Sequence, residues 1–183
     1  MLANMVKVLL AVSCLFFLTC CQEPQFSTPE EVAAHRVQMA TAKIIKDKYG
    51  YRLMGFGGAY NHELKKDKLL SLAFEAHRIL SIEEVRDFLV DSSMIFLNQI
   101  NNDKDLVQYI APVPFGPINI KINLFIHDDK NRRVYDPLLC GGSLFDGKLF
   151  YETVGPEEFA PLKDKYIETY EEAVQKVKAM KKE

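Results

Sequence analysis

Apolar residues recur along this chain with two different spacings, and the spacing changes from one segment to the next. Spacings of three and four residues bring side chains to one face of a helix, whereas strict alternation is typical of a strand with one buried face. The helical spacing occurs over residues 29–49, 81–100 and 166–180. The alternating pattern occurs over 70–76 and 118–126, so the chain contains both kinds of element.

Two of the helical segments begin with the sequence of a capping box. Thr28 is followed by Pro29 and, three residues after the threonine, by Glu31; Ser81 and Glu84 repeat this spacing. In the motif, the hydroxyl and the glutamate each bond a backbone N–H that the first helical turn leaves without a partner. We therefore expect helices to begin directly after Thr28 and Ser81. The expected buried stripes are Ala33, Val37, Ala40 and Ile44 in the first helix, and Val85, Phe88, Leu89, Ile95, Phe96 and Ile100 in the second.

The strand signals suggest two hairpins. Residues 51–60 are rich in glycine, which favours a kinked or bulged strand, and a turn at 61–67 would join them to the alternating segment 70–76. Asp146-Gly147 lies between two short apolar runs and is typical of a two-residue hairpin turn. The clearest strand is 118–126. Its inward positions are expected to be Ile118, Ile120, Ile122, Leu124 and Ile126.

The remaining segments complete the predicted order of elements. Val134 and Tyr135 are expected to begin a return strand, Gly141 and Gly142 to form a turn, and Pro161 to precede the last helix. That helix is expected to carry an apolar stripe of Tyr166, Tyr170, Ala173, Val177 and Met180.

The predicted order is α-β-β-α-β-β-β-α. Hairpin-linked strands with helices before, between and after them indicate an antiparallel sheet of about four to five strands packed against helices, the α+β class. Residues 28–183 have the length of one domain, so we expect a single globular domain there.

The first 21 residues differ from the rest because an uncharged apolar run follows a basic start. Lys7 precedes this run, which covers residues 8–18. It is too short for the roughly 20 apolar residues that a spanning helix needs, and its length matches the core of a secretion signal. We therefore expect the domain to be exported.

The end of this segment, Leu18-Thr19-Cys20-Cys21, resembles the lipobox of bacterial lipoprotein precursors. In that motif an aliphatic residue lies three positions before the cysteine that is lipidated, which makes Cys21 the expected site. Cys20, with Phe17 three positions before it, is the second candidate.

The resemblance implies that residues 1–20 are a cleaved signal peptide and that 21–27 are a lipidated tether, with acyl chains such as palmitate on Cys21. Two or more such chains hold a domain stably at a bilayer. The implied location is a bacterial membrane, and Gln22 after the cysteine favours the outer membrane. A plain secretory signal and an uncleaved membrane anchor stay open as alternatives.

This assignment changes what the composition implies. Three of the four cysteines lie within or beside the signal, so only Cys140 remains in the expected domain. We therefore expect no internal disulfide, no zinc site and no cofactor. The chain carries 23 basic and 25 acidic residues, which does not favour the basic surface that nucleic-acid binding requires.

Two arrangements are candidates for catalysis, and each has a simpler interpretation. Cys140 precedes two glycines whose amides can approach an anionic intermediate, but a buried thiol beside turn glycines is preferred. His77 and His127 are expected on the outward faces of two strands, where they can meet across the sheet, but solvated surface histidines are preferred. The histidines, which show no metal-ligand spacing, are His35, His62, His77 and His127.

A proline-rich loop is the candidate recognition surface. It contains Pro114, Phe115 and Pro117, with the phenylalanine at its middle. The alternative is that Phe115 fills the edge of the core.

The preferred functional hypothesis is a membrane-anchored cell-envelope lipoprotein whose domain is a non-enzymatic module that binds a protein or a small ligand. One alternative is an envelope hydrolase that uses Cys140 or a histidine–carboxylate pair brought together by folding. Another is a structural or assembly factor of the envelope.

Overall fold

The computed structural model describes residues 28–61, 63, 66–157 and 159–182. Residues 33–183 form one compact unit, and the first turn of the first helix belongs to the preceding unit. The helices in the described ranges are α2 (Pro29–Tyr49), α3 (Ile82–Asn102) and α4 (Tyr170–Met180), with short 3-10 turns η2 (Leu106–Gln108) and η3 (Pro117–Asn119). The strands there are β1 (Arg52–Asn61), β2 (Lys66–His77), β3 (Ile120–His127), β4 (Gly141–Phe145), β5 (Lys148–Val154) and β6 (Leu162–Thr169).

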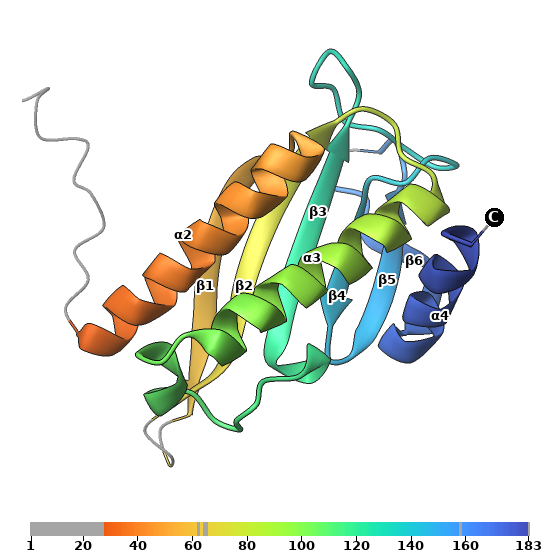
Figure 1. Ribbon diagram of the computed structural model, residues 1–183. Coiled ribbons are helices and arrows are strands. Elements are labelled where there is room, and N and C mark those ends of the chain that lie inside the picture. Colours follow the sequence, from red (N-terminus) through yellow and green to blue (C-terminus); the bar gives the residue numbers. More distant parts are fainter. Residues whose placement is uncertain (1–27, 62, 64–65, 158, 183) are drawn as a thin grey trace, which may run out of the picture. The chain divides into compact units, whose positions relative to one another are not determined.

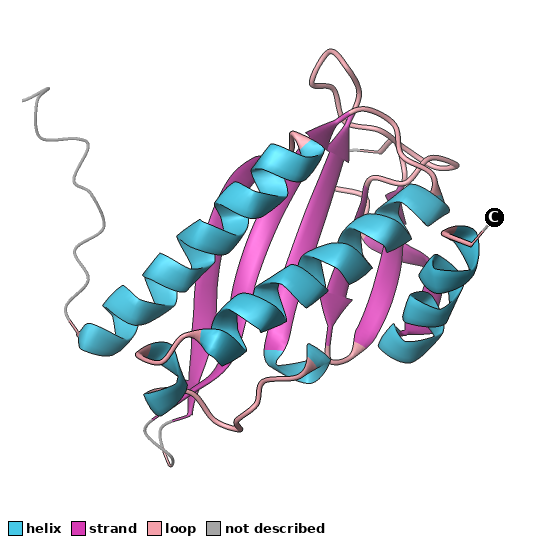
Figure 2. Cartoon of the chain, viewed as in Figure 1, coloured by secondary structure: helices cyan, strands magenta, loops and turns pink. Residues whose placement is uncertain are grey.

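The strands form one mixed sheet in the order β1-β2-β3-β4-β5-β6. Neighbouring strands are antiparallel except β2 and β3, which run parallel. The helices α2, α3 and α4 lie on the same side of the sheet, in front of it as drawn in Figures 1 and 2. One sheet face is therefore covered by helices, and the described chain leaves the opposite face open.

The α+β class is confirmed, and the predicted sheet needs correction. The described residues form six strands where about four to five were expected, and the order is α-β-β-α-β-β-β-β-α. The expectation of a wholly antiparallel sheet is wrong at one junction, because α3 carries the chain back across the sheet and β3 then runs in the same direction as β2.

The extra strand is β6, and it takes up sequence that was expected to be helical. Tyr166 lies in β6, opposite Tyr151 of β5, so it is wrong to place it in the last helix. Helix α4 begins after Thr169, whose hydroxyl accepts a hydrogen bond from the backbone of Glu172 at 3.2 Å. Pairing with β5 gives residues 162–169 ladder hydrogen bonds that outweigh the helical spacing of their apolar side chains.

The predicted starts of the first two helices are confirmed. Thr28 and Glu31 bond each other's backbone N–H at 3.2 Å, and Ser81 and Glu84 form the same capping box. Helix α2 ends before Gly50, which adopts a φ of 73°. The buried stripe of α3 agrees with the expectation except at Ile95, which is half-buried. In α2 the stripe is rotated: Ala40 and Ile44 are exposed, and the buried residues are Ala33, Ala34, Val37, Gln38, Thr41, Ala42 and Ile45.

The core lies between the helices and the covered sheet face. Alternate residues of β3 (Ile120, Ile122, Leu124 and Ile126) are at most 1 % exposed, whereas Ile118, expected among them, lies in η3 and is exposed. Gly142 belongs to β4, so the predicted Gly-Gly turn is wrong. A Cβ at this position would lie 2.5 Å from Val85 Cγ1, which shows that α3 packs directly on the glycine.

Three other expectations are resolved near the sheet ends. The bulged β1–β2 hairpin is confirmed by register shifts between Leu53 and Gly55 and between Ala59 and Tyr60. The Asp146-Gly147 turn is confirmed, with positive φ at both residues. The return strand expected at Val134 and Tyr135 is reduced to an isolated bridge between His127 and Arg133.

The predictions for the signal segment, including Cys20, Cys21 and the tether at 21–27, lie outside the described residues. Within the described ranges, no helix combines the length and the apolar character that crossing a bilayer demands.

Candidate functional site

A buried carboxylate on the open face brings two histidines and an arginine together. Glu75 lies near the end of β2, and its side chain is only 6 % exposed. Its Oε2 accepts hydrogen bonds from Arg52 Nη2 at 2.5 Å and Nε at 3.0 Å, and lies 3.0 Å from His77 Nε2. Its Oε1 lies 3.2 Å from His127 Nδ1. We call Arg52, Glu75, His77 and His127 the Glu75 cluster.

The strand register explains why these residues meet. In β2, Glu75 and His77 are two residues apart and therefore share a face. The parallel pairing places His77 directly opposite His127 of β3, and the antiparallel pairing places Arg52 of β1 opposite Glu75. The two imidazole rings stack with centroids 6.1 Å apart. The two histidines do meet across the sheet, as one of the alternatives expected.

The cluster holds a charged carboxylate next to two groups that can exchange protons. Hydrogen bonds from Arg52 lower the pKa of Glu75, and burial opposes this effect without reversing it. His77 and His127 keep 39 % and 29 % of their side chains exposed, so solvent reaches both rings. A carboxylate that orients an imidazole is the arrangement that general acid–base catalysis uses.

Sequence reasoning identified the two histidines of the cluster but not Glu75 or Arg52. The alternation in β2 placed Glu75 on the same face as His77, and this signal was available. Nothing in the sequence pointed to Arg52, because its position opposite Glu75 depends on the bulged register of β1.

The rest of the open face is partly apolar. Phe125 of β3 and Phe145 of β4 are 46 % and 45 % exposed, and Ile167 of β6 is 45 % exposed. The strand register places these side chains beside small or polar residues of the same face, among them Ser71, Ala73, Asn123 and Ser143. The result is a sheet face with exposed aromatic rings.

Cys140 lies just before β4, half-buried against the core. Burial raises the pKa of its thiol, and the nearby Glu152 carboxylate raises it further. A thiol with a raised pKa is mostly protonated at neutral pH, and the thiolate is the nucleophilic form. The local electrostatics therefore do not favour Cys140 as a nucleophile.

The proline-rich loop has its phenylalanine inside the protein. Phe115 is 3 % exposed, and its backbone N–H and C=O both bond the side chain of Asn101 at 2.8 and 2.9 Å. This position agrees with the alternative expectation, in which Phe115 fills the edge of the core. Pro114 is exposed and Pro117 is half-buried, and recognition through them stays a prediction.

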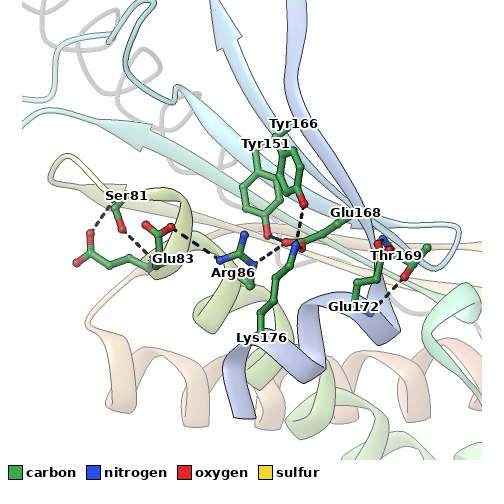
Figure 3. A network of polar contacts seen from close by, with 10 residues as sticks. Ser81, Glu83, Arg86, Tyr151, Tyr166, Glu168, Thr169, Glu172 and Lys176 are labelled. Carbon is green, nitrogen blue, oxygen red and sulfur yellow. Dashed lines mark hydrogen bonds and ion pairs between the residues drawn. The ribbon is translucent and has the colours of Figure 1, made fainter. Parts of the chain in front are cut away.

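A second buried carboxylate lies on the covered face. Glu168 of β6 is 0 % exposed and accepts hydrogen bonds from Arg86 Nε of α3 at 2.6 Å, from Lys176 Nζ of α4 at 2.6 Å and from the Tyr151 hydroxyl. Figure 3 shows these side chains converging on Glu168. Burial by itself would raise the pKa of Glu168, but the three donors outweigh it and lower that pKa. We call this group the Glu168 network.

The Glu168 network joins four elements of the fold. Lys176 also donates to the Tyr166 hydroxyl at 2.7 Å, which ties α4 to β6 a second time. Since α4 fully buries only Ala173 and Val177 against the core, these polar contacts are a large part of what holds it. Sequence reasoning missed the network, because no local pattern relates Arg86 to Glu168.

Other predicted positions carry less chemistry. His35 packs on the Phe56 ring with centroids 4.7 Å apart, and His62 lies outside the described residues. Among the residues that the structure describes, no group of three or more His, Cys, Asp or Glu side chains is arranged to hold a metal ion. A shallow pocket of about 300 Å³ between α3 and α4 is lined by Arg78, Glu83, Glu84, Asp87, Met180 and Lys181.

Comparisons of the chain with protein-family models, with curated proteins and with solved structures found no match.

Proposed function

We propose that this chain is a membrane-anchored bacterial envelope lipoprotein whose domain is a binding module, and that the open sheet face is its binding surface. The observation that carries the proposal is the unequal covering of the sheet. The side opposite the helices keeps Phe125, Phe145 and Ile167 nearly half exposed. The solvated face of a one-sided sheet is usually polar, so large apolar side chains left exposed on it favour a role in binding.

Site-specific photocrosslinking in bacterial cells tests the binding surface. A photoreactive amino acid is placed at Phe145 on the open face or, as a matched control, at Met94 on α3, which is 58 % exposed. We expect a discrete crosslinked product from position 145 that Phe125→Asp abolishes, and none from position 94. Equal products from both positions, or none from 145, would refute the open face as the binding surface.

Fatty-acid labelling tests the anchor. Cells that express the chain are grown with a labelled fatty acid, and the wild type is compared with Cys21→Ser and Cys20→Ser. We expect label in the wild type and in Cys20→Ser, and loss of label in Cys21→Ser. Label that persists in Cys21→Ser would show that another residue carries the lipid, and an unlabelled wild type would rule out lipidation.

The Glu75 cluster favours a second candidate function, an envelope hydrolase. Glu75 would orient His77, whose second ring nitrogen then acts as general base toward a water molecule. The test is hydrolysis of a nitrophenyl ester by the purified chain at several pH values. Loss of turnover in both Glu75→Gln and His77→Gln, with turnover kept in Cys140→Ser, would support this function, and turnover unchanged by the first two would reject it.

A further inference from the structure

On strands β3 to β6, the charges of the open face lie in two rows separated by an uncharged row, and the Arg52–Glu75 pair lies beyond them on β1 and β2. The strand register places Glu152 of β5 opposite Asp164 of β6, and this pair is the acidic row. Lys148 of β5 and Lys121 of β3 lie at the level of Phe145 and form the basic row. Between them runs the middle row, which consists of Asn123, Ser143, Phe150 and Ile167.

The acidic row is unfavourable within a single chain. Like charges directly opposite each other on neighbouring strands destabilise a sheet. Burial raises the pKa of Glu152, Asp164 raises it further, and Lys121 compensates only in part. A cation from outside the chain would therefore be attracted to this row.

The two rows have matching positions on the same strands. In β5, Lys148 and Glu152 lie at equal distances on either side of Phe150, about 13 Å apart at the usual rise of a strand. In β3, Lys121 and Phe125 lie on either side of Asn123 in the same way. A rotation by 180° about an axis along the middle row would thus bring Lys148 to the position of Glu152 and Lys121 to that of Phe125.

This symmetry decides between a second copy and other protein partners. A partner of a single charge sign would be repelled by one of the two rows. A second copy related by the two-fold axis presents the opposite charge to the row on β5, and such an isologous contact forms each pair twice. It also covers Phe125 and Phe145, at the roughly 10 Å spacing of two sheets packed face to face.

We propose that the open face binds the same face of a second copy of this chain in a two-fold dimer, in which Lys148 of each copy pairs with Glu152 of the other. This inference rests on the proposed binding function and names its partner. Lys121 then lies over Phe125 of the other copy as a cation over an aromatic ring.

Charge exchange gives a sharp test. The full chain, purified in mild detergent, is studied by sedimentation equilibrium with correction for bound detergent. We expect the wild type to show twice the mass of a single chain, the latter measured by mass spectrometry of the same sample. Lys148→Glu or Glu152→Lys alone should raise the dimer dissociation constant at least tenfold, because each creates two like-charge contacts. The double variant should restore the dimer.

Mixing the two single variants provides an independent arm. A copy with Lys148→Glu and a copy with Glu152→Lys have attractive contacts only with each other, so differently tagged forms should assemble as mixed dimers. Lys178→Glu on the exposed side of α4 is the matched control and should leave the dimer unchanged. Circular dichroism of each variant confirms that it is folded.

A single-chain mass at every concentration, or a dimer that none of the charge changes weakens, would overturn the inference. The proposed function fails separately. If the chain is monomeric but position 145 crosslinks to another protein, the open face is a binding surface and only the second copy is wrong. If position 145 gives no product and the chain is monomeric, both are wrong.

Discussion

Two buried glutamates on opposite faces of the sheet differ in what surrounds them. Both side chains are almost inaccessible, and both accept a hydrogen bond from an arginine at 2.5 to 2.6 Å. The arginine beside Glu168 is itself buried, with 8 % of its side chain exposed, whereas Arg52 beside Glu75 is 62 % exposed. The Glu168–Arg86 ion pair therefore lies in the interior of the protein, whereas the Glu75–Arg52 ion pair lies at its surface.

This difference separates a structural role from a functional one. The Glu168 network connects α3, α4, β5 and β6, and its Glu168 and Arg86 side chains have little access to solvent. The Glu75 cluster connects only neighbouring strands, and it keeps two imidazoles in contact with water. A group that must exchange protons or meet a partner needs that access, and the Glu75 cluster on the open face has it.

The largest expected effect is the loss of the carboxylate from the covered face. Glu168→Gln removes the carboxylate 2.6 Å from buried Arg86 and leaves it the exposed Glu83 at 4.0 Å, so we expect the free energy of unfolding to fall by about 3–5 kcal/mol. Urea unfolding followed by circular dichroism measures this. Glu171→Gln on the exposed side of α4 is the control, with an expected change below about 1 kcal/mol. Similar small losses in both variants would show that the network does not support the fold.

Neighbouring residues of β3 compare the two faces within one strand. Leu124 points into the core at 1 % exposure, and Phe125 lies on the open face. We expect Leu124→Ala to lower the free energy of unfolding by about 2–5 kcal/mol, and Phe125→Ala to lower it by less than about 1 kcal/mol although it removes more atoms. Urea unfolding at a low protein concentration isolates the effect on the single chain. A large loss at Phe125 would mean that the open face contributes to the core.

The boundaries of several elements were predictable because their signals are local. The capping boxes at Thr28 and Ser81 and the turn at Asp146-Gly147 each act within four residues, and the structure confirms them. The same signal was present at Thr169 and Glu172, where α4 begins. It was outweighed by the helical spacing of Tyr166 and Tyr170, which in fact reflects a strand followed by a helix.

The sheet order and both glutamate groups were not predictable in the same way. The parallel junction of β2 and β3 depends on the path of α3 across the sheet, and the position of Arg52 opposite Glu75 depends on a bulge. Arg86 and Glu168 are separated by 82 positions, and only tertiary packing brings them together. Sequence periodicity indicates which face a residue occupies, but it does not indicate which residue lies opposite.

A smaller effect is expected on the open face when its carboxylate is removed. Glu75→Gln leaves Arg52, His77 and His127 in contact with solvent, so we expect a loss of about 1–2 kcal/mol in the free energy of unfolding. The same unfolding measurement applies, with Glu168→Gln as the comparison. If the two substitutions were equally harmful, the Glu75 cluster would be as much a part of the structural support as the Glu168 network.

The smallest expected effect is of opposite sign and depends on pH. Burial and the neighbouring Asp164 raise the pKa of Glu152 in the folded chain, so ionised Glu152 destabilises the fold at neutral pH. This penalty disappears as the pH falls through the folded pKa toward the unfolded value of about 4.3. We expect Glu152→Gln to stabilise the dilute, monomeric chain at pH 7 by less than about 1 kcal/mol, because solvent screens a half-exposed charge.

The pH dependence distinguishes Glu152 from the two glutamates whose folded pKa is lowered. For Glu75 and Glu168, the stabilising contribution is present above the unfolded value and is lost as the pH falls through the lower folded pKa. The wild type is more stable than Glu168→Gln at neutral pH, and this difference in free energy of unfolding should therefore become smaller at acid pH. The difference in free energy of unfolding between the wild type and Glu152→Gln should also disappear by about pH 4. In this case, however, the variant is the more stable protein at higher pH. A wild type that is more stable than Glu152→Gln at pH 7 in the monomeric state would show that Lys121 compensates Glu152 fully, and the acidic row would then have no need of a cation from a second copy.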